Sequence, residues 1–386
     1  MTPTRLLAPS ALLALLLVLL VPVPALADTG LGTPGVTEAR AWIVEDSTGR
    51  VLAESNADAA FAPASITKVM TAMVALDAGL PMDTEVAMPA HPEDGWEAAQ
   101  VAGYRVGETS TLEDMLEVLL VYSANDAGYA IAEKVAGSQG AFADLMNRKA
   151  AEIGMTRTAF RNPHGLEEDG HESCARDLAA MGRYALTHYP FIARMVRTHA
   201  VTVPVNGEER TFYSTDELMP VYSPLIGIKT GKVEAGTTFL GAARKDGLTL
   251  YTCVLGCATD WGRFEDTRAM MEWAFDGATR LTLADPGRAL EVLPFAYRFG
   301  FSVLVRPQAS VTGLLWPDGG ECSYTRVALS RGQLGIPGES AGACLWRQGD
   351  RIVGACAYVV DTAVSPDAAW SSDPAAPPLP VQRKAA

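Results

Sequence analysis

The sequence predicts an α+β fold: an antiparallel sheet flanked by helices, with a helical region inserted between its strands, followed by a small all-β domain. Three observations lead to this prediction. From residue 39 to 276 the segment order is a hairpin, several amphipathic helices, a group of strands and a last helix. Beyond residue 283, short strands alternate with turns. The chain has 386 residues, enough for one large domain and a smaller one.

The first half of the chain carries one hairpin and four helix signals. Residues 39–54 predict a β-hairpin around the turn 47–49. An apolar stripe after Pro63 predicts a buried helix that begins at Ser65, and residues 81–108 predict loops and short strands. Thr111 has the pattern of an N-cap for a helix that ends near Tyr122. Two further helices are expected over residues 126–135 and 139–153.

The second half returns to strands. Residues 161–177 predict a loop and a helix start, 178–186 a helix, and 200–227 strands with a turn at 206–207. A strand pair is expected to begin at Lys229 and to continue over 237–243 and 248–255, before a helix over 263–275. The strands expected for the small β domain are 297–305, 312–316, 325–329, 343–346 and 351–360.

Both ends of the chain have distinctive compositions. Arg5, an apolar run over 11–21 and a small-residue site at 25–27 predict a secretory signal peptide over 1–27, with an uncleaved anchor as the alternative. The expected organisation is then 28–282 for the catalytic domain, 283–364 for the β domain, and 365–386 for a disordered, proline-rich tail. That tail has no amphipathic stripe, so membrane attachment at the C-terminus is not supported.

Charge and cysteine content narrow the classes of function. A formal net charge of −14 argues against a nucleic-acid partner and against adhesion to anionic lipid. The six cysteines do not form a metal-binding pattern, and the best disulfide candidate joins Cys344 to Cys356 across a hairpin. His164 and His171 are interpreted as structural polar groups, so neither a metal nor another cofactor is expected.

The chemistry of the chain is expected to centre on Ser65 and Lys68. Three residues apart on a helix, these side chains share one face. The serine would lie at the positive helix end, where unpaired amides stabilise developing negative charge, and a neutral Lys68 could take its hydroxyl proton. By itself the pattern is weak evidence, because a serine and a lysine at this spacing more often form a helix N-cap and a surface lysine.

Two further motifs follow in order, Ser123-Ala124-Asn125 and Lys229-Thr230-Gly231. This trio is the signature of class A beta-lactamases and penicillin-binding proteins. With the neighbouring segments 63–72, 112–116, 123–127, 162–166, 175–179 and 227–231, the chain resembles low-molecular-mass penicillin-binding proteins of the serine D-alanyl-D-alanine carboxypeptidase family from about residue 39 to 276. The resemblance implies the beta-lactamase/transpeptidase-like fold.

The resemblance also implies roles. Ser65 would attack the carbonyl between the terminal D-alanines of peptidoglycan stem peptides, Lys68 would be the base, and Ser123 would relay a proton to the leaving amine. Asn125 would hold a substrate amide. The terminal carboxylate would be bound by Lys229, Thr230 and Gly231 together with Arg263. The backbone amides of Ser65 and Lys232 would form the oxyanion hole. Beta-lactam antibiotics would be inhibitors, and the enzyme would act outside the cytoplasmic membrane.

Three other functions compete with this one. A serine beta-lactamase shares the trio, and Glu167 and Glu168 lie in a loop of suitable chain position, although the Asn-Pro-His-Gly-Leu context of residues 162–166 matches the carboxypeptidases. A non-catalytic wall-binding module would keep the fold but has no need of a proton-transfer set. A third function would place the main role in the β domain as a docking surface.

Overall fold

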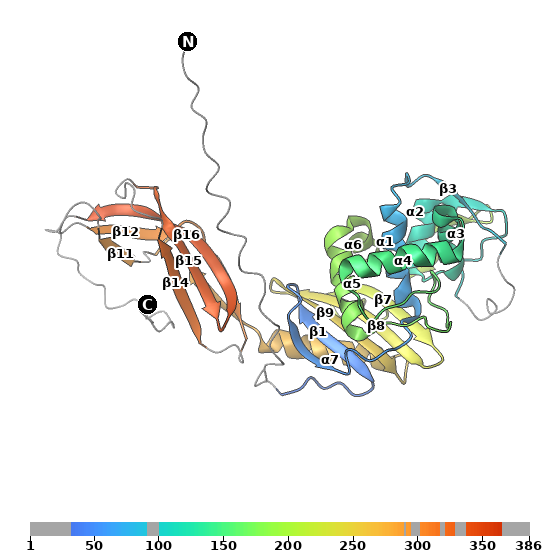
Figure 1. The fold of residues 1–386 in the computed structure, drawn as a ribbon, viewed down its shortest axis with the longest axis horizontal. Helices are drawn as coiled ribbons and strands as arrows, with labels where there is room; N and C mark the ends of the chain where they lie inside the picture. Colours follow the sequence, from blue (N-terminus) through green and yellow to red (C-terminus); the bar gives the residue numbers. More distant parts are fainter. Residues whose placement is uncertain are drawn as a thin grey trace, which may run out of the picture.

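The computed structural model describes residues 32–90, 100–288, 291–294, 302–316, 321–328 and 337–364. They form two bodies, a larger one of helices around a sheet and a smaller one built of strands (Figure 1). The predicted signal peptide at 1–27 and the predicted tail at 365–386 lie outside the described residues. No helix in the described ranges is both long enough and apolar enough to cross a bilayer.

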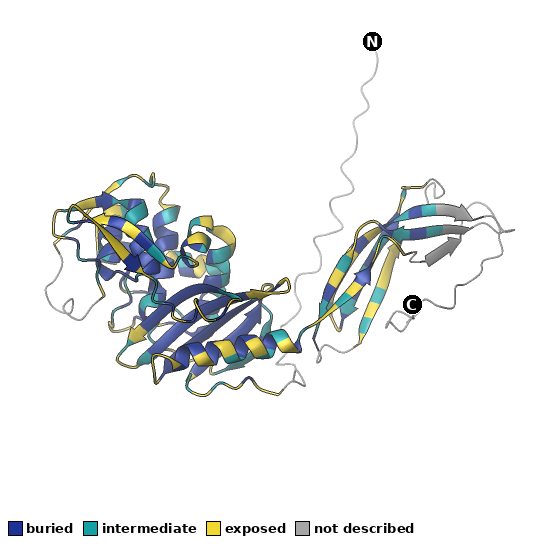
Figure 2. Cartoon of the chain, turned by 180° about the vertical axis from the view of Figure 1, so that it is seen from behind, coloured by how far each residue is buried: buried dark blue, intermediate teal, exposed yellow. Residues whose placement is uncertain are grey.

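The larger body is organised around a five-stranded antiparallel sheet in the order β2-β1-β9-β8-β7. Its strands are β1 (Ala41–Asp46), β2 (Val51–Ser55), β7 (Leu225–Val233), β8 (Gly236–Lys245) and β9 (Leu248–Cys257). Strands β8 and β9 are buried along most of their length, because helices cover both faces of the sheet (Figure 2). The predicted α+β fold is confirmed.

Successive side chains of β1 point to opposite faces of the sheet and pack into two different cores. Ile43 packs into the core shared with the inserted helices, whereas Trp42 and Val44 pack into the core under the last helix, α7 (Gly262–Gly277). Helix α5 (Ala175–His188) lies on the opposite face from α7. The inserted region is thereby anchored to one side of the sheet.

The inserted region holds the remaining helices and two small hairpins. Its helices are the 3-10 turn η1 (Ala64–Ile66), α1 (Thr67–Asp77), α2 (Leu112–Val121), α3 (Asn125–Ala136), α4 (Gln139–Ile153) and α6 (Pro190–Met195). The hairpins pair β3 (Glu85–Ala87) with β4 (Thr109–Thr111), and β5 (Ala200–Val205) with β6 (Glu208–Tyr213). Residues 67–75 of α1 are all buried, so this helix is the axis of the region.

Local signals explain most helix boundaries. Thr111 Oγ1 accepts a hydrogen bond from the Asp114 amide at 3.1 Å, which confirms the predicted cap of α2. Helix α5 begins at Ala175, within the segment 161–177 where a helix start is predicted, and the Cys174 sulfur caps the Asp177 amide. Asn125 is the first residue of α3 instead of a turn residue. The six-residue α6, which starts at Pro190, was not expected.

The smaller body contains a five-stranded sheet in the order β11-β12-β16-β15-β14 and the pair β10-β13. The strands are β10 (Thr279–Ala284), β11 (Glu291–Pro294), β12 (Ser302–Pro307), β13 (Val311–Leu315), β14 (Cys322–Ala328), β15 (Ser340–Gln348) and β16 (Arg351–Val364). Sequence reasoning did not anticipate β10 or β11. Cys344 and Cys356 lie directly opposite each other on β15 and β16, but the structure has no disulfide between them, so the predicted pairing is not formed.

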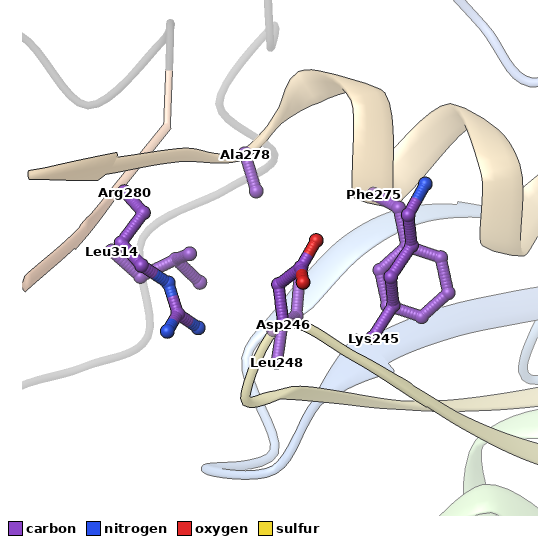
Figure 3. A pocket seen from close by; sticks show the side chains of 7 residues that line it. All are labelled: Lys245, Asp246, Leu248, Phe275, Ala278, Arg280 and Leu314. Atoms are coloured by element: carbon purple, nitrogen blue, oxygen red, sulfur yellow. The ribbon is translucent and has the colours of Figure 1, made fainter. Parts of the chain in front are cut away.

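Trp316 joins the two bodies. Its side chain is buried within the core beneath α7, and the Arg50 guanidinium lies 5.6 Å from the centre of its ring. Gln348 holds the Trp316 backbone by accepting from its N–H and donating to its carbonyl oxygen. A groove of about 290 Å³ lies beside this junction, between the β8–β9 turn, the end of α7 and β10. Figure 3 shows the side chains that line it. The Lys245 ammonium lies 5.8 Å from the centre of the Phe275 ring.

Candidate active site

Ser65 and Lys68 meet at the start of the central helix, as their spacing predicts. Ser65 lies in η1, and Lys68 Nζ is 2.7 Å from Ser65 Oγ. Lys68 is fully buried and also donates to the His164 carbonyl oxygen at 2.6 Å. Burial, then the nearby charge of Lys229, hold the pKa of Lys68 well below its ordinary value, whereas Asp126 acts in the opposite direction. The lowered pKa favours the neutral form of the Lys68 amine, which lies in contact with the Ser65 hydroxyl.

The loop over residues 162–166 supports this pair from one side. Asn162 braces the loop by accepting from the Gly165 amide at 2.7 Å and donating to the Leu166 carbonyl. Gly165 has φ +86°, and a Cβ atom there would lie 2.0 Å from the Ala64 carbonyl oxygen. Only glycine allows the loop to approach η1 this closely.

Two unusual backbone conformations accompany the motifs. Five described residues other than glycine have positive φ, and three of them are Asn or Asp, which tolerate it. The other two are Ala64, directly before Ser65, and Ser123, with φ of +50° and +73°. Such conformations cost about 1–3 kcal/mol each and persist where the surrounding structure imposes them.

The second motif lies at the junction of α2 and α3. Ser123 and Asn125 are both buried, and the backbone N–H of Asn125 donates to the backbone carbonyl of Gln100 at 2.8 Å. Asn125 Oδ1 is buried without a hydrogen-bond partner in the described part of the chain. Helix α3 packs closely on the loop that holds Lys68, since a Cβ atom at Gly128 would lie 3.4 Å from the Pro163 carbonyl oxygen.

The third motif lies in the middle of β7, in contact with η1, and not at a strand start as expected. A Cβ atom at Gly231 would lie 2.8 Å from Ala64 Cβ and 3.1 Å from the Ser65 nitrogen. Lys229 is 2% exposed and donates to the Thr230 carbonyl at 3.1 Å, while the Thr230 hydroxyl contacts that of Thr215 at 2.5 Å. Burial, followed by the charge of Arg263, lowers the pKa of Lys229 to about 7.

Arg263 reaches the same strand from α7. Its Nη1 donates to the Gly231 carbonyl at 2.9 Å, and its guanidinium lies 4.8 Å from the centre of the Phe264 ring. Lys232, the next residue of β7, points to the surface and pairs with Asp260 at 2.7 Å. The structure thus brings Ser65, Lys68, Lys229, Gly231 and Arg263 together around η1.

Two supporting carboxylates were not anticipated from the sequence. Asp126 accepts from the amides of Ala102, Gly103 and Tyr104, and so fixes the segment 100–104 against the start of α3. Asp216 is buried near Lys229 and Arg263. An acidic residue directly after Asn125 was the only sequence signal for the first of these carboxylates.

The two histidines take structural positions. His171 Nδ1 accepts from the Arg161 amide at 3.0 Å, so its Nε2–H donates to Thr67 Oγ1 at 2.9 Å. Burial lowers the pKa of His171 to about 4 and that of His164 to about 3, which keeps both rings neutral. Within the described residues, no three His, Cys, Asp or Glu side chains are grouped so that they could hold a metal ion.

Comparison with known proteins places this geometry in a family. The D-alanyl-D-alanine carboxypeptidase family, Peptidase_S11, matches residues 29–259. The chain belongs to this family. The carboxypeptidase DacF of Bacillus subtilis is 34% identical over 245 residues, which cover 61% of this chain and 61% of that protein.

Solved structures agree with this assignment to the D-alanyl-D-alanine carboxypeptidase family. Penicillin binding protein 6B of Escherichia coli, at 23% identity, matches 84% of this chain and 96% of its own with a TM-score of 0.65, and so shares the fold. Penicillin-Binding Protein D2 of Listeria monocytogenes in its cefotaxime-bound form is 28% identical, with a TM-score of 0.56, over 63% of this chain and all of its own.

Proposed function

We propose that this protein is an exported serine D-alanyl-D-alanine carboxypeptidase that removes the terminal D-alanine from peptidoglycan stem pentapeptides through an acyl-enzyme on Ser65. The observation that carries the proposal is the contact between Ser65 Oγ and the buried Lys68 amine at 2.7 Å. A buried lysine with a lowered pKa is the group that converts a serine hydroxyl into a nucleophile without histidine.

In the acylation step, Lys68 Nζ takes the Ser65 hydroxyl proton as Oγ attacks the carbonyl carbon between the two D-alanines. The His164 carbonyl accepts a hydrogen bond from Lys68 and orients its lone pair toward Oγ. The backbone amides of Ser65 and Lys232 hold the oxyanion. The proton then passes through Ser123 to the leaving amine, free D-alanine departs, and water hydrolyses the ester to restore Ser65.

Binding of the substrate follows from the remaining polar groups. Asn125 Oδ1, buried and without a partner in the described residues, is available to accept from a substrate amide. Lys229, Thr230 and Arg263 bind the terminal carboxylate, because Lys229 on β7 and Arg263, which reaches β7 from α7, are buried basic groups that attract a negative charge. Gly231 allows β7 to lie close to the Ser65 amide, since a Cβ atom there would meet Thr238 Oγ1 at 2.5 Å and Ala64 Cβ at 2.8 Å.

The remaining parts of the proposal concern location and organisation. Peptidoglycan lies outside the cytoplasmic membrane, so residues 1–27 would direct export, residues 28–282 would form the catalytic domain and 283–364 the β domain. Beta-lactams would acylate Ser65 as inhibitors, in line with the related Listeria protein, whose structure holds cefotaxime. Glu167 and Glu168 are exposed, and Glu168 accepts from Asn162, which favours the carboxypeptidase over a class A beta-lactamase.

The test combines labelling with product analysis. The protein is incubated with a fluorescent penicillin, the labelled residue is mapped by mass spectrometry, and D-alanine release from a stem pentapeptide is measured. Slowly released label on Ser65 together with D-alanine release is the expected result, and Ser65→Ala should abolish both. Rapid penicillin turnover without D-alanine would instead identify a beta-lactamase. No acylation of the folded protein by either compound would leave only a binding module.

A further inference from the structure

Asp216 is a buried acidic side chain that the mechanism above does not use. It is 8% exposed and lies in the turn between β6 and β7. Its Oδ1 accepts from the Leu218 and Met219 amides at 3.1 and 3.2 Å. Its Oδ2 is buried and has no hydrogen-bond partner in the described part of the chain. Because an unpaired carboxylate oxygen is costly to bury, this atom calls for a partner.

A small cavity provides the place for one. It has a volume of about 10 Å³ and is lined by residues 214–216 on one side and by residues 228–230 on the other. A cavity of this volume has room for about one water molecule. Asp216 and Lys229 both line this cavity, and an ammonium group has three N–H donors, so a water molecule there can accept from Lys229 and donate to Asp216.

The charges around the cavity are few. Two charged groups act on Asp216, Lys229 from β7 and Arg263 from α7. The walls from α2 and the α6 end are apolar: Leu120, Val121, Met195 and Val196. Burial and the charge of Arg263 both disfavour the protonated form of Lys229, whereas the negative charge of Asp216 favours it.

From this arrangement we propose that Asp216 is a positioning residue for Lys229: through one water molecule in the shared cavity it acts as the counter-ion that keeps Lys229 protonated for the substrate carboxylate. The inference rests on the proposed function, in which Lys229 binds that carboxylate. Since protonated Lys229 binds the carboxylate, affinity is present below its pKa and is lost as pH rises through it.

Asp216→Asn is the decisive variant, because it keeps an oxygen for the Leu218 and Met219 amides and removes only the charge. Without the counter-ion the pKa of Lys229 falls further. The pH at which KM begins to rise should therefore move down by about one unit, which corresponds to about a tenfold higher KM above that pH, with kcat within about twofold. The matched control is Glu217→Gln, which removes a charge from the adjacent, exposed residue and should move the midpoint by less than about 0.3 unit.

The experiment measures D-alanine release from a stem pentapeptide as a function of pH, and in parallel follows the titration of Lys229 by NMR of protein labelled with ¹³C-lysine, with Lys229→Met to assign the signal. A downward shift in both profiles for Asp216→Asn, and not for Glu217→Gln, is expected. An unchanged Lys229 titration in Asp216→Asn would overturn the inference, as would a loss of activity uniform across pH. Absence of D-alanine release from the wild type would refute the proposed function, while the NMR titration still decides the role of Asp216. If Asp216→Asn does not fold, Asp216→Ser serves in both measurements.

Discussion

Gly165→Ala should disrupt the nucleophile without touching any reactive group. The new Cβ atom would lie 2.0 Å from the Ala64 carbonyl oxygen, whereas ordinary contacts begin near 3.4 Å. Either the loop over 162–166 or the turn carrying Ser65 must therefore move by more than an ångström. The same loop supplies the His164 carbonyl that holds Lys68. The substitution should thus displace Ser65 and Lys68 from each other.

The expected loss of stability in Gly165→Ala has two parts, and a loss of rate accompanies the second. An alanine at φ +86° costs about 1–2 kcal/mol wherever it occurs. Overpacking against the η1 backbone adds about 1–3 kcal/mol, and a displacement of about 1 Å at a reacting atom lowers the rate by about 10²-fold. Gly154→Ala is the matched control, because Gly154 has φ +89° but no atom lies within 4 Å of its Cβ position.

Urea unfolding and the rate constant for acylation by a fluorescent penicillin measure the two parts separately. Gly154→Ala should lose only the first part of the stability and keep its acylation rate. Gly165→Ala should lose more stability and acylate about 10²-fold more slowly. If the two variants lose the same stability and both acylate at the wild-type rate, the close approach of the loop to η1 does not position Ser65.

Three further predictions follow from the buried polar groups. Lys68→Met should slow penicillin acylation by about 10²–10⁴-fold, as expected for loss of a general base. The thermal midpoint of unfolding should be unchanged or higher, because a buried amine is removed. A normal acylation rate would show that Lys68 has no part in the mechanism. Asp126→Ala leaves three backbone amides unpaired and should cost on the order of 3 kcal/mol in urea unfolding, with faster proteolysis near residue 102; unchanged stability would contradict that anchoring role. His171 binds fewer protons folded than unfolded between its folded pKa of about 4 and its ordinary value of 6.5, so stability should fall as pH falls through this window. His171→Gln should flatten that fall by up to about 3 kcal/mol, and an unchanged pH profile of unfolding would show that the imidazole is not the cause.

Much of the fold was accessible from local patterns. The Thr111 cap, the Asn206-Gly207 turn and the helix over Gln139–Ile153 each depend on residues a few positions apart, and the structure confirms them. The elements that were missed lack such signals. Helix α6 has six residues, too few to show a helical repeat, and β10 is defined by its pairing with β13 across the chain.

The candidate site was likewise predictable from the sequence only in part. Spacing alone placed Ser65 and Lys68 on one helix face, and motif order indicated Ser123, Asn125, Lys229 and Arg263. Burial of Lys68 could not be derived from that pattern, since a lysine in the same position on an exposed helix would be an ordinary charged group. Nor could the Asp216 environment, which arises where the β6–β7 turn packs on β7.

The sequence by itself determined which residues can act as nucleophile, base and carboxylate ligands, and which segments form most helices and strands, because both depend on residue type and short-range spacing. Only the tertiary structure decided that Lys68 is desolvated, that Gly165 and Gly231 both approach η1 closely, and that Asp216 lies beside Lys229. Proton affinity and close approach depend on dielectric, charge and volume around an atom, and these are set by segments that the fold brings together from different parts of the chain.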